Sequence, residues 1–365
     1  MTSLAMVTNN AEYDRDREIK RFDESKKGVK GLVDSGLTAI PKFFIHPPQV
    51  LSDLKPHPET RPGSNSISIP IIDLSDRRSA IVDKMSRAAR EWGFFWITNH
   101  GIPSETLDRT MAAIKAFHEQ PTEVKSPFYS RETGNSVWYV SNFDLYHSKT
   151  AFWSDTLQVK MGPNPPAPEE VPEICRKEVE EWDKEAERLG EKLMGFMCEG
   201  LGLSTDRLKE ITCLEWRSMV CHYYPPCPQP DLTLGAASHT DSNILTALIQ
   251  DQTGGLQVKY GGVWVDVEPI PGAIVINVGD LLQIISNDEY KSVEHRVLAN
   301  SSSKPRISIA TFFKPCKGEL IYGPLPELIS PEKPPLFRQF TLSEFMRKFF
   351  TKALDGKTLL NHYRV

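Results

Sequence analysis

Two histidines and one aspartate in the second half of the chain could together bind a metal ion. His239 and Asp241 are two positions apart in Ser-His-Thr-Asp-Ser. On an extended strand both side chains would therefore point to one face, with Thr240 directed away. His295 follows in a second stretch, residues 292–297, that also favours a short strand. Two imidazoles and one carboxylate leave half of an octahedron open for further ligands, an arrangement suited to ferrous iron.

Arg306 and Ser308 form another pair two positions apart, on one face of a predicted strand at 306–313. A guanidinium donates two parallel hydrogen bonds to a carboxylate, and a hydroxyl beside it can add a third. We therefore expect a clamp for the far carboxylate of a diacid close to the metal.

The order His-x-Asp, His and Arg-x-Ser resembles that of the 2-oxoglutarate- and Fe(II)-dependent dioxygenases. Residues 222–228 (His-Tyr-Tyr-Pro-Pro-Cys-Pro), 69–74 and 92–101 extend this resemblance over nearly the whole chain and are similar to the soluble plant branch. Within that branch, residues 28–36 followed by Ile40-Pro41 resemble the homologues of aminocyclopropane-carboxylate oxidase. Many of those homologues oxidise specialised metabolites.

The resemblance implies a set of roles and cofactors. Fe(II) would be held by His239, Asp241 and His295, and O2 and the cosubstrate 2-oxoglutarate would take the open positions. Arg306, Ser308 and Tyr224 would hold the distal carboxylate of 2-oxoglutarate, and ascorbate would act as an activator. The expected reaction is hydroxylation, demethylation, desaturation or ring closure of a small plant metabolite, with release of succinate and CO2.

Five side chains are candidates for contact with the substrate. Phe312 lies on the same predicted strand face as Arg306 and resembles the family's substrate-stacking aromatic residue, although packing in the core explains it equally well. The aromatic residues at 143, 146 and 152 could line the pocket mouth or simply cover an edge of the core. His222 replaces the asparagine of the family's motif, so its role stays open. The five candidates are Phe312, Phe143, Tyr146, Phe152 and His222.

Composition narrows the class of protein. The 365 residues carry a net charge of −5, which gives no reason to expect nucleic acid or an anionic membrane as a partner. No apolar run reaches the length of a membrane span, and the expected location is the cytoplasm. Six cysteines without Cys-x-x-Cys spacing suggest neither a disulfide framework nor a zinc site. We expect a monomer whose partner is a small-molecule substrate.

We expect an α+β fold, a double-stranded β-helix (jelly-roll) core with flanking helices. The jelly roll follows from the resemblance, and the strand pattern permits it. The predicted organisation is an N-terminal extension and linker at 1–62, a mostly helical region at 63–215 packed on the core, and the catalytic core with a C-terminal helix at 216–365. All three parts would form one compact unit.

Periodicity and turn residues predict the individual elements. In the first half, residues 13–27 could at best form a solvent-exposed helix, and residues 46–62 are a proline-rich extended linker. Strands are expected at 69–74 and 94–99, and helices at 78–92, from the N-cap Ser104 onward, and at 172–200, which is the longest. Residues 127–157 show no periodicity. In the second half they are a hairpin of 256–260 with 263–267, an apolar strand at 273–278, a turn containing Asp280, and a helix at 340–354.

Three other functions compete with this interpretation. An ethylene-forming oxidase would use the same iron ligands with ascorbate instead of 2-oxoglutarate, so succinate release distinguishes it. A hydrolase with zinc in a His₂Asp site is chemically possible and would work without oxygen. A catalytically inactive ligand-binding sensor on the same scaffold would be expected to lose a metal ligand, whereas this chain retains all three.

Overall fold

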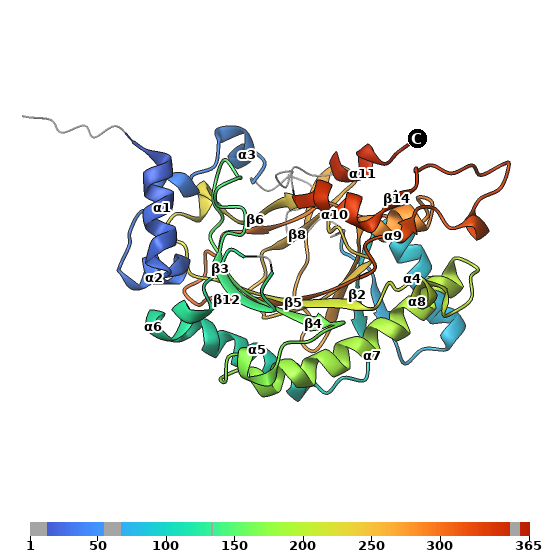
Figure 1. Cartoon of the computed structure of the whole chain (residues 1–365), viewed down its shortest axis with the longest axis horizontal. Coiled ribbons are helices and arrows are strands. Elements are labelled where there is room, and N and C mark those ends of the chain that lie inside the picture. Colours follow the sequence, from blue (N-terminus) through green and yellow to red (C-terminus); the bar gives the residue numbers. More distant parts are fainter. Residues whose placement is uncertain (1–12, 55–66, 133, 351–357) are drawn as a thin grey trace, which may run out of the picture.

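Two β-sheets face each other at the centre of the molecule (Figure 1). The computed structural model describes residues 13–54, 67–132, 134–350 and 358–365. The larger sheet contains, in spatial order, β1 (Ile71–Asp73), β2 (Phe94–Thr98), β10 (Ile274–Val278), β7 (Leu245–Gln250), β12 (Arg306–Lys314), β5 (Trp216–Tyr224), β4 (Asp155–Gly162) and β3 (Val137–Ser141). The smaller sheet contains β6 (Leu234–His239), β11 (His295–Leu298), β8 (Leu256–Tyr260) and β9 (Val263–Asp266).

Every neighbouring pair in these two sheets is antiparallel except β1 with β2, which are parallel. β8 and β9 form the predicted hairpin around Gly261-Gly262, where both glycines have positive φ (57° and 86°), as a tight turn of this kind requires. Two facing sheets with flanking helices agree with the predicted α+β jelly-roll core. A separate two-stranded sheet joins β13 (Ile321–Tyr322) to β14 (Phe340–Thr341).

Three helices cover the outer face of the larger sheet, namely α4 (Arg78–Glu91), α5 (Ser104–Glu119) and α7 (Arg176–Gly200) (Figure 1). Their apolar faces pack against alternate residues of β12 such as Ile309 and Phe313. On this same face the indole Nε1 of Trp182 donates to Thr311 Oγ1 at 2.8 Å. The other residues of β12 therefore point toward the smaller sheet, which fixes the face on which a site can lie.

The N-terminal extension packs on the protein more closely than its sequence predicts. It forms α1 (Arg15–Ser25), α2 (Gly28–Asp34) and α3 (Pro48–Ser52). The prediction of a solvated helix is wrong for α1, because Ile19 and Phe22 are buried against the aromatic cluster around Trp153. The helix α3 also interrupts the predicted extended linker, whose residues 55–62 lie outside the described part.

The segment 127–157 is the largest error in the predicted elements. It contains β3 and the start of β4, which pair in register with Tyr139 opposite Leu157. Periodicity failed there because Trp138 and Tyr139 are both buried, so apolar and polar residues do not alternate along β3.

Two boundary predictions are also wrong. Ser104 is the first residue of α5, and the preceding Pro103, with no side-chain cap, takes the N-cap position. Asp280 is not in a turn but begins α9 (Asp280–Ile285).

The C-terminal helix is confirmed as α10 (Leu342–Phe350), with residues 351–354 outside the described part. The remaining helices are α6 (Thr122–Lys125), α8 (Arg207–Glu210) and α11 (Thr358–His362).

Within the described ranges, none of the helices combines the length and the apolar character needed to cross a bilayer.

Candidate metal centre

Two neighbouring strands of the smaller sheet bring the two histidines of the predicted site together. His239 ends β6, His295 begins β11, and the two residues lie opposite each other in these antiparallel strands. Their ring centroids are 4.3 Å apart. Asp241 lies in the loop that follows β6. The prediction that His239 and Asp241 share one face of a strand is therefore wrong. The loop after β6, and not the strand, directs the carboxylate of Asp241 toward the imidazoles.

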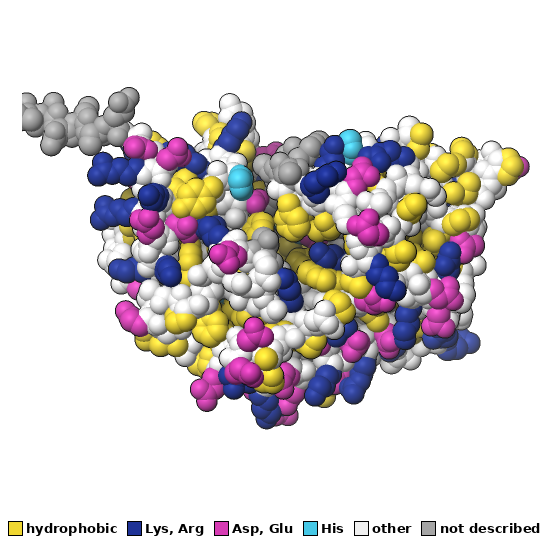
Figure 2. Space-filling model, viewed as in Figure 1, with side chains coloured by type: hydrophobic (Ala, Val, Ile, Leu, Met, Phe, Trp, Pro, Cys, Tyr) yellow, Lys and Arg dark blue, Asp and Glu magenta, His cyan; other side chains and the backbone are white. Residues whose placement is uncertain are grey.

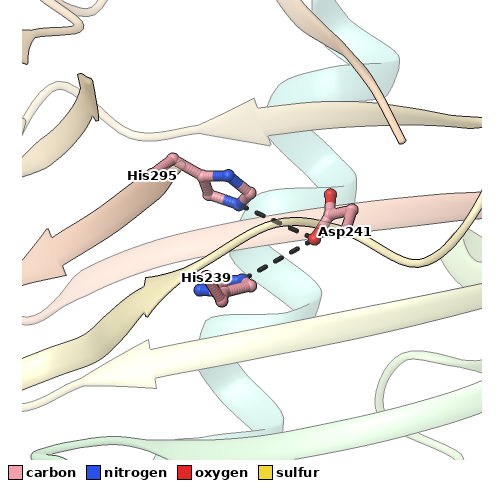
Figure 3. A group of neighbouring side chains, drawn as sticks. All are labelled: His239, Asp241 and His295. Carbon is pink, nitrogen blue, oxygen red and sulfur yellow. Dashed lines mark ion pairs between the residues drawn. The ribbon is translucent and has the colours of Figure 1, made fainter. Parts of the chain in front are cut away.

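One oxygen of Asp241 faces both histidines (Figure 3). The Nε2 atoms of His239 and His295 are each 3.6 Å from Asp241 Oδ1, and the ligand atoms of all three residues lie within 4.8 Å of one another. Ligand atoms about 2.1 Å from one ion and at right angles lie about 3 Å apart, so a small contraction would bring all three onto a single ion.

Backbone carbonyls orient both imidazoles. The Nδ1–H group of His239 donates to Ala237 O at 2.8 Å, and that of His295 donates to Val293 O at 3.2 Å. The proton on Nδ1 leaves the lone pair of Nε2 directed at the shared point, which is the usual arrangement of metal-binding histidines. Burial lowers the pKa of His295 to about 4, so this ring is neutral at physiological pH and able to bind a metal.

Two side chains from the larger sheet hold the other oxygen of Asp241. Thr246 Oγ1 donates to Asp241 Oδ2 at 2.6 Å, and Asn277 Nδ2 donates to the same oxygen at 2.8 Å. Asn243 Nδ2 in turn donates to Thr246 Oγ1. Burial alone would raise the pKa of Asp241, but the two histidines and these hydrogen bonds outweigh it and hold the pKa below its ordinary value.

Sequence reasoning missed Thr246 and Asn277. Asn277 is the one polar residue in the strand Ala273–Val278, which otherwise reads Ala-Ile-Val-Ile-Val. A lone amide in a strand that is buried on both faces must find a partner, and this was the available signal.

The predicted clamp lies on the inner face of the larger sheet. Arg306 is 2% exposed, and its Nη1 donates to Ser308 Oγ at 3.1 Å. Two further hydrogen bonds run to neutral oxygens, from Nε to Gly254 O and from Nη2 to Gln250 Oε1, both at 2.6 Å. Tyr224 pairs with Arg306 across β5 and β12, and the guanidinium lies over its ring.

The clamp suits a carboxylate that comes from outside the chain. Among the described residues no Asp or Glu forms an ion pair with Arg306, although its guanidinium is buried. The amide Nε2 of Gln250 is also buried there without a partner. A buried cation and an unused buried donor are costly unless an anion satisfies them.

His222 lies beside the clamp on β5. It pairs with Ser308 on one side and with Thr156 on the other, and its Nδ1 is 3.0 Å from Thr156 Oγ1. Burial, followed by the charges of Arg306 and His239, lowers the pKa of His222 to about 4. A neutral imidazole therefore faces the site.

The predicted substrate aromatics lie in two different places. Phe312 is half-buried on the inner face of β12, beside Thr246 on β7. Phe143 is 48% exposed and contacts the ring of Phe350 on α10. Tyr146 is 51% exposed and donates its hydroxyl to Asp23 of α1, while Phe152 packs against His46. Only Phe312 shares the sheet face that carries the clamp.

Comparison with known proteins gives family matches over both halves of the chain. Residues 216–315 match the model of the 2OG-Fe(II) oxygenase superfamily, and residues 69–182 match the N-terminal model described as non-haem dioxygenase in morphine synthesis. The Arabidopsis thaliana protein named 1-aminocyclopropane-1-carboxylate oxidase homolog 1 is 47% identical over 363 residues, which cover 97% of this chain and 98% of that protein.

Solved structures agree with these matches. JOX2 in complex with 2OG, Fe and JA is 31% identical, with a TM-score of 0.80, and the alignment covers 93% of this chain and 97% of that chain. The dioxygenase for auxin oxidation 1 from Arabidopsis thaliana, in a binary complex with 2-oxoglutarate, is 26% identical with a TM-score of 0.62, and the alignment covers 73% of this chain and 99% of that chain.

Proposed function

The chain belongs to the 2OG-Fe(II) oxygenase superfamily, and from this premise we propose that His239, Asp241 and His295 hold its Fe(II). The protein is an Fe(II)- and 2-oxoglutarate-dependent dioxygenase. When bound, the iron supplies the oxygen chemistry that couples decarboxylation of 2-oxoglutarate, to succinate and CO2, with oxidation of the substrate. The observation that carries the assignment is the convergence of three ligand atoms, together with a buried guanidinium that forms no ion pair with any of the described residues.

In this proposal Arg306, Ser308 and Tyr224 hold the distal carboxylate of 2-oxoglutarate. The guanidinium offers charge-assisted hydrogen bonds in a fixed planar geometry, and its contact with Tyr224 keeps the two groups together. Gln250 joins this set, because its unused Nε2 lies beside the same guanidinium. These residues orient the cosubstrate so that its keto-acid end reaches the metal.

The proposed substrate is a small plant specialised metabolite, and hydroxylation is the proposed outcome. The names of the relatives support this choice, since JOX2 was solved with JA and the Arabidopsis neighbour is named for auxin oxidation. Phe312 supports it as well, because its ring is half-buried beside the residue that positions Asp241.

Anaerobic titration tests the metal and cosubstrate sites directly. Wild-type protein should bind one Fe(II), and 2-oxoglutarate should then produce the visible charge-transfer absorption of a 2-oxo acid chelated to ferrous iron. His295→Ala should bind neither, while His362→Gln, which removes an imidazole on α11, should behave as wild type. With O2 added, succinate should form as 2-oxoglutarate disappears. Turnover with ascorbate but without 2-oxoglutarate would contradict the proposal and favour the ethylene-forming type.

A further inference from the structure

A row of polar side chains crosses the inner face of the larger sheet. Thr156 on β4 pairs with His222 on β5. His222 pairs with Ser308 on β12, which in turn pairs with Gln250 on β7. Residues directly opposite each other on antiparallel strands share one face of the sheet, with Cβ atoms about 4.5–5.5 Å apart. Ser308 and Gln250 already belong to the proposed 2-oxoglutarate site, so the row extends that site toward β4.

This row faces a space that a small molecule can reach. His222 and Thr156 are only half-buried, although β5 and β4 are interior strands of the sheet. Figure 2, which is viewed as Figure 1, shows a hollow near the centre of the face that is drawn, where Figure 1 shows the two sheets facing each other. Part of the His222 ring is therefore accessible from the space between the sheets.

The contact between Thr156 and His222 determines which ring nitrogen carries the proton. Nδ1 of His222 is 3.0 Å from Thr156 Oγ1. A hydroxyl has one proton to donate, and the described residues offer this hydroxyl no other acceptor. In the neutral ring, the arrangement that leaves no proton unpaired is donation from the hydroxyl to Nδ1, which places the ring proton on Nε2.

The two metal-binding histidines carry their proton on the opposite nitrogen. Nδ1 of His239 and Nδ1 of His295 each face a backbone carbonyl, which can only accept, so their Nε2 atoms present lone pairs. Nε2 of His222 instead presents an N–H group, and it has no hydrogen-bond partner among the residues that the structure describes. A bound molecule that displaces water from this N–H group must therefore offer it an oxygen acceptor.

The arginine of the predicted clamp lies close to His222. After burial, the charge of Arg306 is the largest influence that lowers the pKa of His222 to about 4, ahead of the charge of His239. Arg306 also donates to Ser308, which lies directly opposite His222. A carboxylate held by Arg306 and Ser308 is therefore beside the His222 ring. A neutral imidazole adds a donor there without adding a second positive charge.

We propose that Nε2 of His222 donates a hydrogen bond to the distal carboxylate of 2-oxoglutarate, and that Thr156 is the positioning residue that keeps the proton on this nitrogen. The inference rests on the proposed function for the place of that carboxylate. His222 stands where the family's motif has asparagine. An amide always carries N–H donors, whereas an imidazole presents a donor at Nε2 only in one tautomer, so the replacement requires a partner such as Thr156.

Anaerobic titration of the Fe(II)-loaded protein with two 2-oxo acids tests the hydrogen bond. 2-Oxopentanoate has the carbon chain of 2-oxoglutarate without the distal carboxylate, and the charge-transfer absorption reports the binding of both. His222→Phe should weaken 2-oxoglutarate binding about tenfold or more, because a charge-assisted hydrogen bond is lost, and should change 2-oxopentanoate binding less than about twofold. His222→Asn keeps an N–H donor and should lie closer to the wild type. The matched control is His147→Phe, which removes an exposed imidazole and should leave both affinities unchanged.

Two substitutions of Thr156 test the positioning role. Thr156→Val should weaken 2-oxoglutarate binding about 2- to 10-fold, the usual effect of losing a neutral hydrogen bond, and Thr156→Ser, which keeps the hydroxyl, should bind as the wild type does. Nitrogen NMR of the imidazoles, with diamagnetic Zn(II) in place of Fe(II), should show the proton of His222 on Nε2. The absence of this signal in His222→Phe identifies it.

Three results would overturn the inference. These are a proton on Nδ1 of His222, a loss in His222→Phe that is absent or equal for the two 2-oxo acids, and equal affinities in Thr156→Val and Thr156→Ser. Failure of the Fe(II)-loaded wild type to bind 2-oxoglutarate would instead count against the proposed function, and the two failures are therefore distinguishable.

Discussion

Arg306 and Tyr224 occupy paired positions on β12 and β5, and the guanidinium of Arg306 lies 4.8 Å from the centroid of the tyrosine ring. The pair holds a full positive charge in the interior of the protein beside neutral oxygens only. A dicarboxylate cosubstrate bound there, as we propose, would supply the counter-charge that the described residues do not. Such a counter-charge would offset the cost of burying the arginine, and this contact gives the first of three predictions.

Replacing Arg306 should weaken 2-oxoglutarate binding while leaving the metal in place. For Arg306→Gln we expect the apparent KM for 2-oxoglutarate to rise roughly 10- to 100-fold, because charge-assisted hydrogen bonds are worth about 1.5–3 kcal/mol. Tyr224→Phe, which removes one hydroxyl, should have a smaller effect in the same direction. Initial rates of 2-oxoglutarate consumption measure both changes, and anaerobic Fe(II) titration serves as the control. An unchanged KM in Arg306→Gln would show that the distal carboxylate binds elsewhere.

Thr246→Val should reduce Fe(II) affinity about 10- to 100-fold, the usual effect of removing a hydrogen bond to a metal-binding side chain. The substitution leaves Asp241 Oδ2 with only the bond from Asn277, so the carboxylate is less firmly directed at the metal. Thr311→Val is the matched control, since Thr311 is also a buried threonine of the larger sheet but accepts from Trp182. Competition with a ferrous chelator gives both affinities, and equal losses in the two variants would contradict a positioning role.

Asp23→Asn should lower the free energy of unfolding by about 1–3 kcal/mol, because a partly buried carboxylate that accepts several hydrogen bonds loses its charge. Asp23 accepts from Arg131 and from the hydroxyls of Tyr129 and Tyr146. Urea unfolding at pH 7 measures the loss. Asp16→Asn, on the same helix but 97% exposed, should change it by less than about 0.5 kcal/mol.

The contribution of Asp23 should also depend on pH. Burial would raise the pKa of Asp23, but the hydrogen bonds from Arg131 and Tyr129 outweigh it and hold the pKa below 3.8. The stabilisation is therefore complete above the ordinary pKa and is lost as pH falls through the lower, folded value. Wild type and Asp23→Asn should converge in acid. A constant difference between them down to pH 3 would argue against an ionic origin.

The parts of the site that the sequence predicted are those in which side-chain type and local spacing are decisive. His239, Asp241 and His295 could be selected because few residue types bind iron, and Arg306 with Ser308 because residues two apart share a strand face. The jelly-roll core was predicted from the family resemblance. β3 was missed because Trp138 and Tyr139 are both buried, which removes the alternation that identifies a strand.

The sequence by itself thus predicted the class of fold, three residues that could bind a metal, and the pair Arg306 and Ser308 on one strand face. Only the tertiary structure decided that Thr246 and Asn277 would hold one oxygen of Asp241, and that Gln250 would accept a hydrogen bond from Arg306 while its Nε2 stays buried without a partner among the described residues. The physical reason is that strand order and register bring together residues far apart in the chain. Local periodicity reports which face a side chain occupies, but not which side chain from another strand lies beside it.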